Sequence, residues 1–494
     1  MIKNLFRLIF LLFAAAIISA ILYIFNLPPF QTPLATIKSD PNSIAEEEKN
    51  LPPELKDKVG RDKSFEEIMT RAAQLEQNGF PALAIAQYQE DYKKNPNNLT
   101  PLYERGKVHL RNNAPAKAEE IYRQILEKQP NNTDAKVYLG RSLLQQRKIS
   151  EAKTIFDAIT DNTQTVKYYQ GIIAAYFGEN DQAQSLLNQS ISIGGSDDLK
   201  AKANNFLGAY NEYKFNTEST ELHLKVLLAR SFNQCGEYEM AIPLLFEVNK
   251  QKLDYRDAWI LLGYAYLQTG KYQDAIEALE RAKVLDNQKP ETLFYLGLGY
   301  YSLNNFKEAE ANLSKAKEFG FEPQILVDQK LAEIYLEQQD YSKSAANYEK
   351  VLALNSEDVN YFVRPIWIYI EKLKQPDKAL ALALKAAQSH PNSAMAHNLM
   401  GWTLIYNNQL GKAEAHLKLA MALQPDLDAV YLNYGLLLEK RNLPQKALVF
   451  YKKAHALGQG DGVAASAATR YNQLLATINQ TQSAKTLQAN TLSQ

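Results

Sequence analysis

The chain has 494 residues, which is enough for several compact domains at the usual size of roughly 100–200 residues each. Lys plus Arg and Asp plus Glu both total 55, so the formal net charge is zero and the basic excess typical of nucleic-acid-binding proteins is missing. Cys235 is the only cysteine, which excludes an internal disulfide and a cysteine-based metal cluster. From the balanced charge we expect no nucleic-acid partner.

The N-terminus predicts a membrane anchor. Residues 8–25 carry no charge, and Leu5, Phe6 and Leu27 lengthen the apolar segment so that a helix over residues 5–27 approaches the ~30 Å hydrocarbon core. Lys3 and Arg7 precede residues 8–25, and no basic residue follows until Lys38. The positive-inside rule therefore predicts that residues 1–27 form a cytoplasmic end and a signal-anchor, and that the rest of the chain is exported. The alternative is a cleaved signal peptide, which would release an exported soluble protein.

A linker follows at residues 28–64. It contains six prolines and an acidic run at residues 46–48, a composition that disfavours a long helix and buries little apolar surface. We expect an extended tether between the membrane and the remaining chain.

Residues 65–461 show an internal repeat in which most steps from one unit to the next are 34 or 35 residues. The clearest unit begins at Arg256 and places large, small and aromatic residues in a fixed order: Trp259, Leu262, Gly263, Tyr266, Gly270, Tyr272, Ala275, Leu279 and Ala282. This order resembles the tetratricopeptide-repeat (TPR) pattern. The same frame predicts units starting near residues 65, 99, 133, 164, 222, 256, 290, 325, 360, 394 and 428.

Two columns of small residues support the frame. In the second helix of each unit the column is Ala except for Ser344, because helices approach closely only where their crossing residues are small. In the first helix the column is Gly or Ala except for Trp367, so we expect the unit at 360 to be distorted. One hairpin cannot bury its apolar face alone, and the units must therefore stack.

The predicted fold is all-α: a TPR α-solenoid, a right-handed superhelix of helix hairpins, with one N-terminal transmembrane helix. The predicted parts are a first block at 65–193, a joint with an extra helix at 194–221, a second block at 222–461, a capping helix at 462–478 and a disordered tail at 479–494.

The motif search predicts no catalysis. The sequence contains no phosphate-binding loop, no zinc-protease helix and no nucleophile elbow, and the Gly297-Leu298-Gly299 run lies within a predicted helix. We expect no cofactor, no metal and no small-molecule substrate.

The TPR resemblance implies a protein or peptide partner in the concave surface lined by the first helices. The predicted groove residues are basic in the first block and mainly aromatic later, the types enriched at binding hot spots: Tyr103, Lys107, Arg141, Arg230, Tyr264, Phe294, Tyr301, Arg364, Trp402 and Tyr406. The central column contains no Asn and the paired Lys is absent, which disfavours the clamp that grips cytosolic chaperones.

These observations predict a membrane-anchored interaction scaffold with its TPR domain in the periplasm or outside the cell. Bacterial single-anchor TPR proteins similar to this serve cytochrome maturation, polysaccharide export, lipopolysaccharide control and pilus assembly, so the resemblance implies envelope or secretion assembly. The alternative is a regulatory or adaptor subunit of a separately encoded enzyme.

Overall fold

The computed structural model describes residues 65–77, 79–215, 220–458 and 462–492. These residues form 24 α-helices and no β-strand. They divide into two compact units, one made of residues 92–319 and the other of residues 65–91 and 320–492. The predicted anchor and linker lie outside the described residues. Among the helices that are described, none is both long and apolar enough to cross a bilayer.

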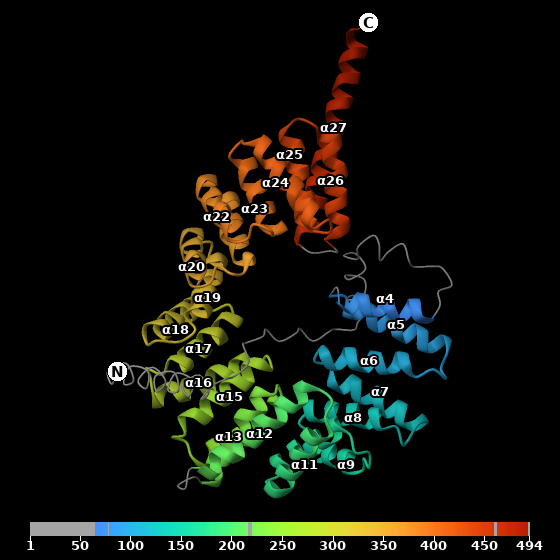
Figure 1. Cartoon of the computed structure of the whole chain (residues 1–494), viewed down its shortest axis with the longest axis vertical. Coiled ribbons are helices and arrows are strands. Elements are labelled where there is room, and N and C mark those ends of the chain that lie inside the picture. Colours follow the sequence, from blue (N-terminus) through green and yellow to red (C-terminus); the bar gives the residue numbers. More distant parts are fainter. Residues whose placement is uncertain (1–64, 78, 216–219, 459–461, 493–494) are drawn as a thin grey trace, which may run out of the picture. The chain divides into compact units, whose positions relative to one another are not determined.

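Most helices follow one another as antiparallel hairpins of the predicted length (Figure 1). The hairpins up to residue 319 are α4 (Phe65–Gln77) with α5 (Pro81–Lys94), α6 (Thr100–Arg111) with α7 (Pro115–Lys128), α8 (Thr133–Gln145) with α9 (Ile149–Asp157), α10 (Gln164–Tyr176) with α11 (Asn180–Ile193), α13 (Glu221–Gln234) with α14 (Tyr238–Gln251), α15 (Arg256–Gln268) with α16 (Tyr272–Leu285) and α17 (Pro290–Ser302) with α18 (Phe306–Glu318).

The second unit continues this arrangement. Its hairpins are α19 (Gln324–Glu337) with α20 (Tyr341–Leu354), α23 (Ala394–Tyr406) with α24 (Leu410–Leu423) and α25 (Asp428–Lys440) with α26 (Pro444–Leu457). Helix α22 (Pro376–Ser389) follows a broken first helix, which consists of η1 (Val359–Phe362), α21 (Val363–Trp367) and η2 (Ile368–Lys372).

A left-handed residue ends the first helix of each hairpin. Asn113, for example, has φ of 53°, and the next amide, that of Ala114, donates back to the carbonyl of His109 at 2.8 Å. This is a Schellman-type cap, which satisfies carbonyls that the helix leaves open and turns the chain sharply. Gly270, with φ of 73°, holds the same place in the unit that begins at Arg256.

The small-residue column brings the two helices of a hairpin together. At each of seven glycines in this column, an added Cβ would come within 2.3–2.9 Å of a large side chain sixteen residues later in the second helix. The pairs are Gly106 with Tyr122, Gly140 with Phe156, Gly171 with Leu187, Gly263 with Leu279, Gly297 with Leu313, Gly401 with Leu417 and Gly435 with Tyr451. The repeat therefore encodes a large side chain packed into the space that glycine leaves.

The unit at 360 is distorted, as its sequence predicted. Trp367 occupies the small-residue column, and the residue sixteen positions later is Ala383, so large and small have exchanged places. The first helix here changes from 3-10 to α to π geometry over residues 359–372. Insertion of a wider turn is a common response to an oversized side chain in a packed helix.

Helix α12 (Asp197–Phe215) lies in the predicted joint and belongs to the hydrophobic core. Ala203, Phe206, Ala209 and Tyr210 are buried, and the Phe206 ring meets that of Phe232 on α13 at 4.8 Å between centroids. The division of the repeats into two blocks at residues 194–221 stays a prediction. Helix α27 (Gly462–Leu492) packs on α26 and extends past residue 478, where the capping helix was expected to end.

Candidate functional site

The ten predicted groove residues fall in both compact units. Arg364, Trp402 and Tyr406 belong to the second unit, and the other seven lie within residues 92–319. Two of the seven are in the core: Tyr264 is 0% exposed between the rings of Tyr238 and Tyr295, and Phe294 is 6% exposed. Their side chains pack between helices, because the following helix covers that part of the first-helix surface.

The polar groove residues of the first unit mostly have partners within the chain. Lys107 pairs with Glu104 at 2.7 Å, and Arg230 pairs with Glu212 of α12. The Tyr103 hydroxyl donates to the side chain of Asn132, and burial raises the pKa of this phenol to about 12. These contacts leave little of their polar capacity for a ligand.

Arg141 differs from its basic neighbours. Its guanidinium lies over the rings of Tyr138 and Tyr169, at 5.3 and 5.9 Å from their centroids. Burial opposes its charge, yet the nearby Tyr169 phenol and Glu237 carboxylate raise its pKa. Arg141 lines a cavity of about 370 Å³, here named the Arg141 pocket, together with Tyr169, Lys202, Glu237 and Glu239 among others.

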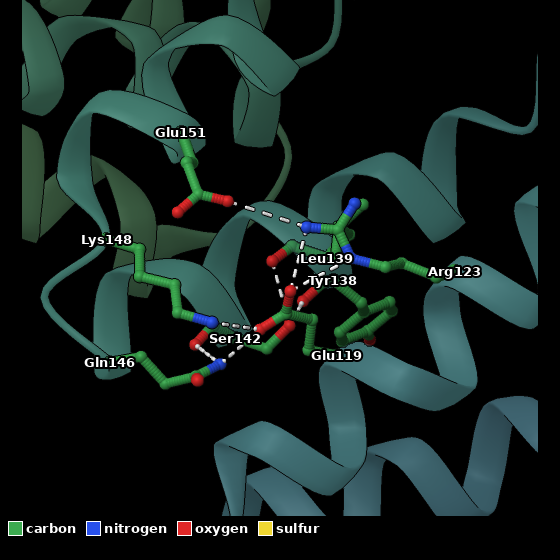
Figure 2. Close-up of polar contacts among 8 residues, drawn as sticks. All are labelled: Glu119, Arg123, Tyr138, Leu139, Ser142, Gln146, Lys148 and Glu151. Atoms are coloured by element: carbon green, nitrogen blue, oxygen red, sulfur yellow. Dashed lines mark hydrogen bonds and ion pairs between the residues drawn. The ribbon is translucent and has the colours of Figure 1, made fainter.

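A second polar cluster in the same unit is satisfied internally (Figure 2). Glu119 of α7 receives Lys148 and Gln146, each at 2.8 Å, and Arg123 at 2.8 Å. Partial burial opposes ionisation of Glu119, but these hydrogen bonds lower its pKa to about 2. Because its donors come from α7 and from the turn between α8 and α9, this network ties successive helices together rather than presenting charge to a ligand.

The largest cavity described in the second unit, about 940 Å³, lies over α21, η2, α23, α25 and the start of α27. We name it the tryptophan groove, after Trp367 and Trp402. Its apolar lining also includes Met395, Leu432 and Val463. Two of the chain's three tryptophans therefore line one concave surface, where large rigid side chains are effective in binding.

Cations surround the aromatic lining of the tryptophan groove. Arg364 and Lys372 lie over the Trp367 ring at 5.8 and 5.2 Å from its centroid, and Arg470 of α27 also lines the groove. The Trp402 ring meets Tyr406 edge-on at 6.5 Å.

Tyr406 is held at the base of this aromatic cluster. Its hydroxyl donates to Glu371 at 2.7 Å, and burial followed by this contact raises the pKa of Tyr406 to about 12. The phenol is therefore neutral and oriented at physiological pH, which fixes the ring against which Trp402 rests.

A buried amide pair lies in the wall of the tryptophan groove. Asn433 Nδ2 donates to Asn398 Oδ1 at 2.9 Å, and both side chains are under 10% exposed. Within the part of the chain that the structure describes, Asn398 Nδ2 donates to Met395 Sδ at 3.9 Å, a weak acceptor. Both residues line the tryptophan groove, so this amide pair places polar groups in an otherwise largely aromatic and aliphatic wall.

Several groove residues were missed by the sequence prediction. Trp367 was noted only as an irregularity in the small-residue column, although this departure was the available signal. Arg470 was assigned to the capping helix, and Asn398 and Asn433 lie one position apart in their repeats, so no column contained them both. Within the described residues, no cluster of three or more His, Cys, Asp or Glu side chains is arranged to hold a metal.

Family comparisons match four stretches of the chain. Models described as tetratricopeptide repeat match residues 71–133, 109–176 and 329–358, and one described as TPR repeat matches residues 263–304. No curated protein matches the chain.

Solved structures of similar proteins include three TPR-like chains. A tetratricopeptide repeat protein from Parabacteroides merdae is 14% identical, with 51% of this chain and 98% of that chain covered and a TM-score of 0.37. PilF of Pseudomonas aeruginosa is 19% identical (45% and 97% covered, TM-score 0.33), and yeast Tom70 is 13% identical (84% and 96% covered, TM-score 0.32). The repeat frame, the hairpins and the four family matches together make this chain a tetratricopeptide-repeat protein.

Proposed function

We propose that the protein is an interaction scaffold that binds an extended segment of a partner protein in the tryptophan groove. The observation that carries this proposal is the cavity itself, about 940 Å³, which combines two tryptophans, three cations and a buried amide pair. Aromatic side chains would supply apolar contact, and the Asn398–Asn433 pair would hold the partner's backbone. The protein acts by binding and not by catalysis.

The scaffold is anchored in the inner membrane through residues 5–27 and carries its repeats in the periplasm or outside the cell. The charge asymmetry around the apolar segment supports this topology. In that location a scaffold would assemble envelope or secretion machinery. Reporter enzymes fused to the C-terminus test the topology: activity of a periplasmic reporter is expected, and activity of a cytoplasmic reporter alone contradicts it.

Crosslinking and affinity capture of the full-length protein from its native membrane test the binding proposal. Trp402→Ala should reduce partner recovery by at least about tenfold, since truncating a central aromatic anchor costs about 2 kcal/mol or more. Trp259→Ala is the matched control, because this half-buried tryptophan lies on α15 in the other unit and bonds the carbonyl of Leu253 at 2.9 Å.

The captured proteins distinguish the scaffold from an adaptor. A reproducible set of envelope or secretion proteins supports the scaffold, whereas a single dominant enzyme indicates a regulatory subunit. Equal recovery by Trp402→Ala and the control, with unchanged thermal unfolding of both, would remove the tryptophan groove from partner binding.

A further inference from the structure

Among the described residues, Arg141 forms no ion pair, although the field of the nearby Glu237 carboxylate raises its pKa. Lys107 and Arg230, which hold the same column of their units, are paired with Glu104 and Glu212. Among the described residues, no carboxylate lies within 4.0 Å of the Arg141 guanidinium and no group accepts a hydrogen bond from it. No nitrogen of Arg141 is among the buried side-chain atoms that lack a partner, so its N–H donors stay open to water or to a ligand.

The guanidinium is held ready for a ligand by aromatic rings. Tyr138 and Tyr169 lie against it, at 5.3 and 5.9 Å. Both rings are themselves fixed: Tyr138 stacks on Tyr122, and Tyr169 stacks on Phe156, each at 5.2 Å between centroids. The two rings hold the guanidinium in place, and its planar N–H fork, which donates to no described residue, is available to a carboxylate.

The other charges of the Arg141 pocket are mostly neutralised. Glu239 is shared by Arg147 and by Lys271, which lies at 3.3 Å, and Lys202 pairs with Asp198 at 2.8 Å. The Arg141 N–H donors and an acceptor oxygen of the Glu237 carboxylate remain available to a ligand.

The side-chain carboxylate of Glu237 has one hydrogen-bond partner among the described residues. The Tyr169 hydroxyl donates to its carboxylate at 3.5 Å, a long contact. Burial raises the pKa of Glu237, and the fields of Arg141 and Lys202 oppose that rise. The pocket thus offers a strong donor fork next to an unfilled acceptor, which complements a carboxylate next to an N–H group.

We propose that the Arg141 pocket binds the side-chain carboxylate of an aspartate or glutamate in an extended segment of a partner protein. The carboxylate pairs with the Arg141 fork, and Glu237 accepts a hydrogen bond from a neighbouring backbone amide of the same segment. The volume of about 370 Å³ suits a side chain and its adjoining backbone rather than a folded element. This site lies in residues 92–319 and goes beyond the function proposed for the tryptophan groove.

Purified full-length protein in detergent, applied to an array of peptide pairs that differ only by Glu or Gln, tests this proposal. Each pair is also printed with a free and an amidated C-terminus, so that side-chain and terminal carboxylates are read separately. We expect a class of peptides whose Glu form binds at least about tenfold better than the Gln form, a difference of about 1.4 kcal/mol.

Variants identify the residue responsible. Arg141→Gln should bring the ratio of Glu-form to Gln-form binding close to one. Arg141→Lys should restore only part of this ratio, because an ammonium lacks the planar fork. Lys107→Gln is the matched control and should keep the full ratio, since Lys107 already pairs with Glu104. Trp402→Ala should lower binding of other peptides without changing the Glu-to-Gln ratio of this class, which separates the two sites.

Three results would overturn the proposal. One is the absence of any peptide class that depends on a Glu side chain. Another is an unchanged ratio in Arg141→Gln while Lys107→Gln behaves like the parent protein. A preference that follows the free C-terminus alone would assign the pocket to chain ends instead of acidic side chains.

Discussion

Gly140→Ala tests the packing that defines the repeat. The added Cβ would lie 2.3 Å from Cε2 of Phe156, far inside normal contact. Phe156 is fully buried and stacked on Tyr169, so its ring has little room to move. Overpacking at the upper end of its usual range costs about 3 kcal/mol. Alanine recovers about 1 kcal/mol of helix propensity. We therefore expect a local destabilisation of about 2 kcal/mol.

Gly411→Ala is the matched control. Gly411 also lies in a helix, α24, but nothing is within 4 Å of its Cβ position. The same substitution should stabilise this helix, by at most about 1 kcal/mol, through propensity alone. The same substitution should therefore lower the free energy of unfolding at Gly140 and raise it at Gly411.

Hydrogen exchange read by mass spectrometry is the suitable assay, because repeat arrays unfold locally and a single midpoint can hide the effect. Amides of α8 and α9 should exchange faster in Gly140→Ala, whereas those of α23 and α24 should slow or stay unchanged in Gly411→Ala. In a Phe156→Ala background, Gly140→Ala should no longer destabilise, because the clashing ring is gone. Equal stabilisation by both glycine substitutions would refute the packing argument.

Three further predictions concern single side chains. The pKa of Glu119 lies near 2 in the fold against an ordinary 4.5, so its stabilising contribution is complete above about pH 4.5 and is lost as pH falls toward 2. Glu119→Gln should therefore lower the urea midpoint of unfolding at pH 7 but barely change it at pH 2. A loss of stability that is the same at both pH values would contradict this. Burial raises the pKa of Cys235 to about 12, so a thiol reagent at pH 8 should react only after unfolding, and rapid reaction of the native protein would show that the thiol is exposed. Gly270→Ala should destabilise by about 1 kcal/mol in chemical denaturation, because alanine is strained at φ of 73°, and a neutral result would mean that the turn relaxes.

Most of the fold was predictable from the sequence because a repeat copies one local solution many times. Glycine in the first helix and a large residue sixteen positions later recur in seven units, and each pair contacts in the structure as the spacing requires. Trp367 is the one large residue in the first-helix column, and the helix that contains it is broken. These features depend on contacts within one hairpin, and such contacts are encoded in consecutive residues.

The candidate sites depended on contacts that the repeat period does not carry. Arg141 and Arg230 share a column, yet only Arg230 meets a carboxylate, because Glu212 comes from the extra helix α12. Tyr264 lies in the same column but is buried by Tyr295 of the next hairpin, and Arg470 reaches the tryptophan groove from α27. The sequence by itself determined the hairpins and their stacking, since these follow from side-chain size at fixed spacing. Only the tertiary structure decided which charges and rings remain open to a partner, because that depends on whichever side chains neighbouring helices place against them.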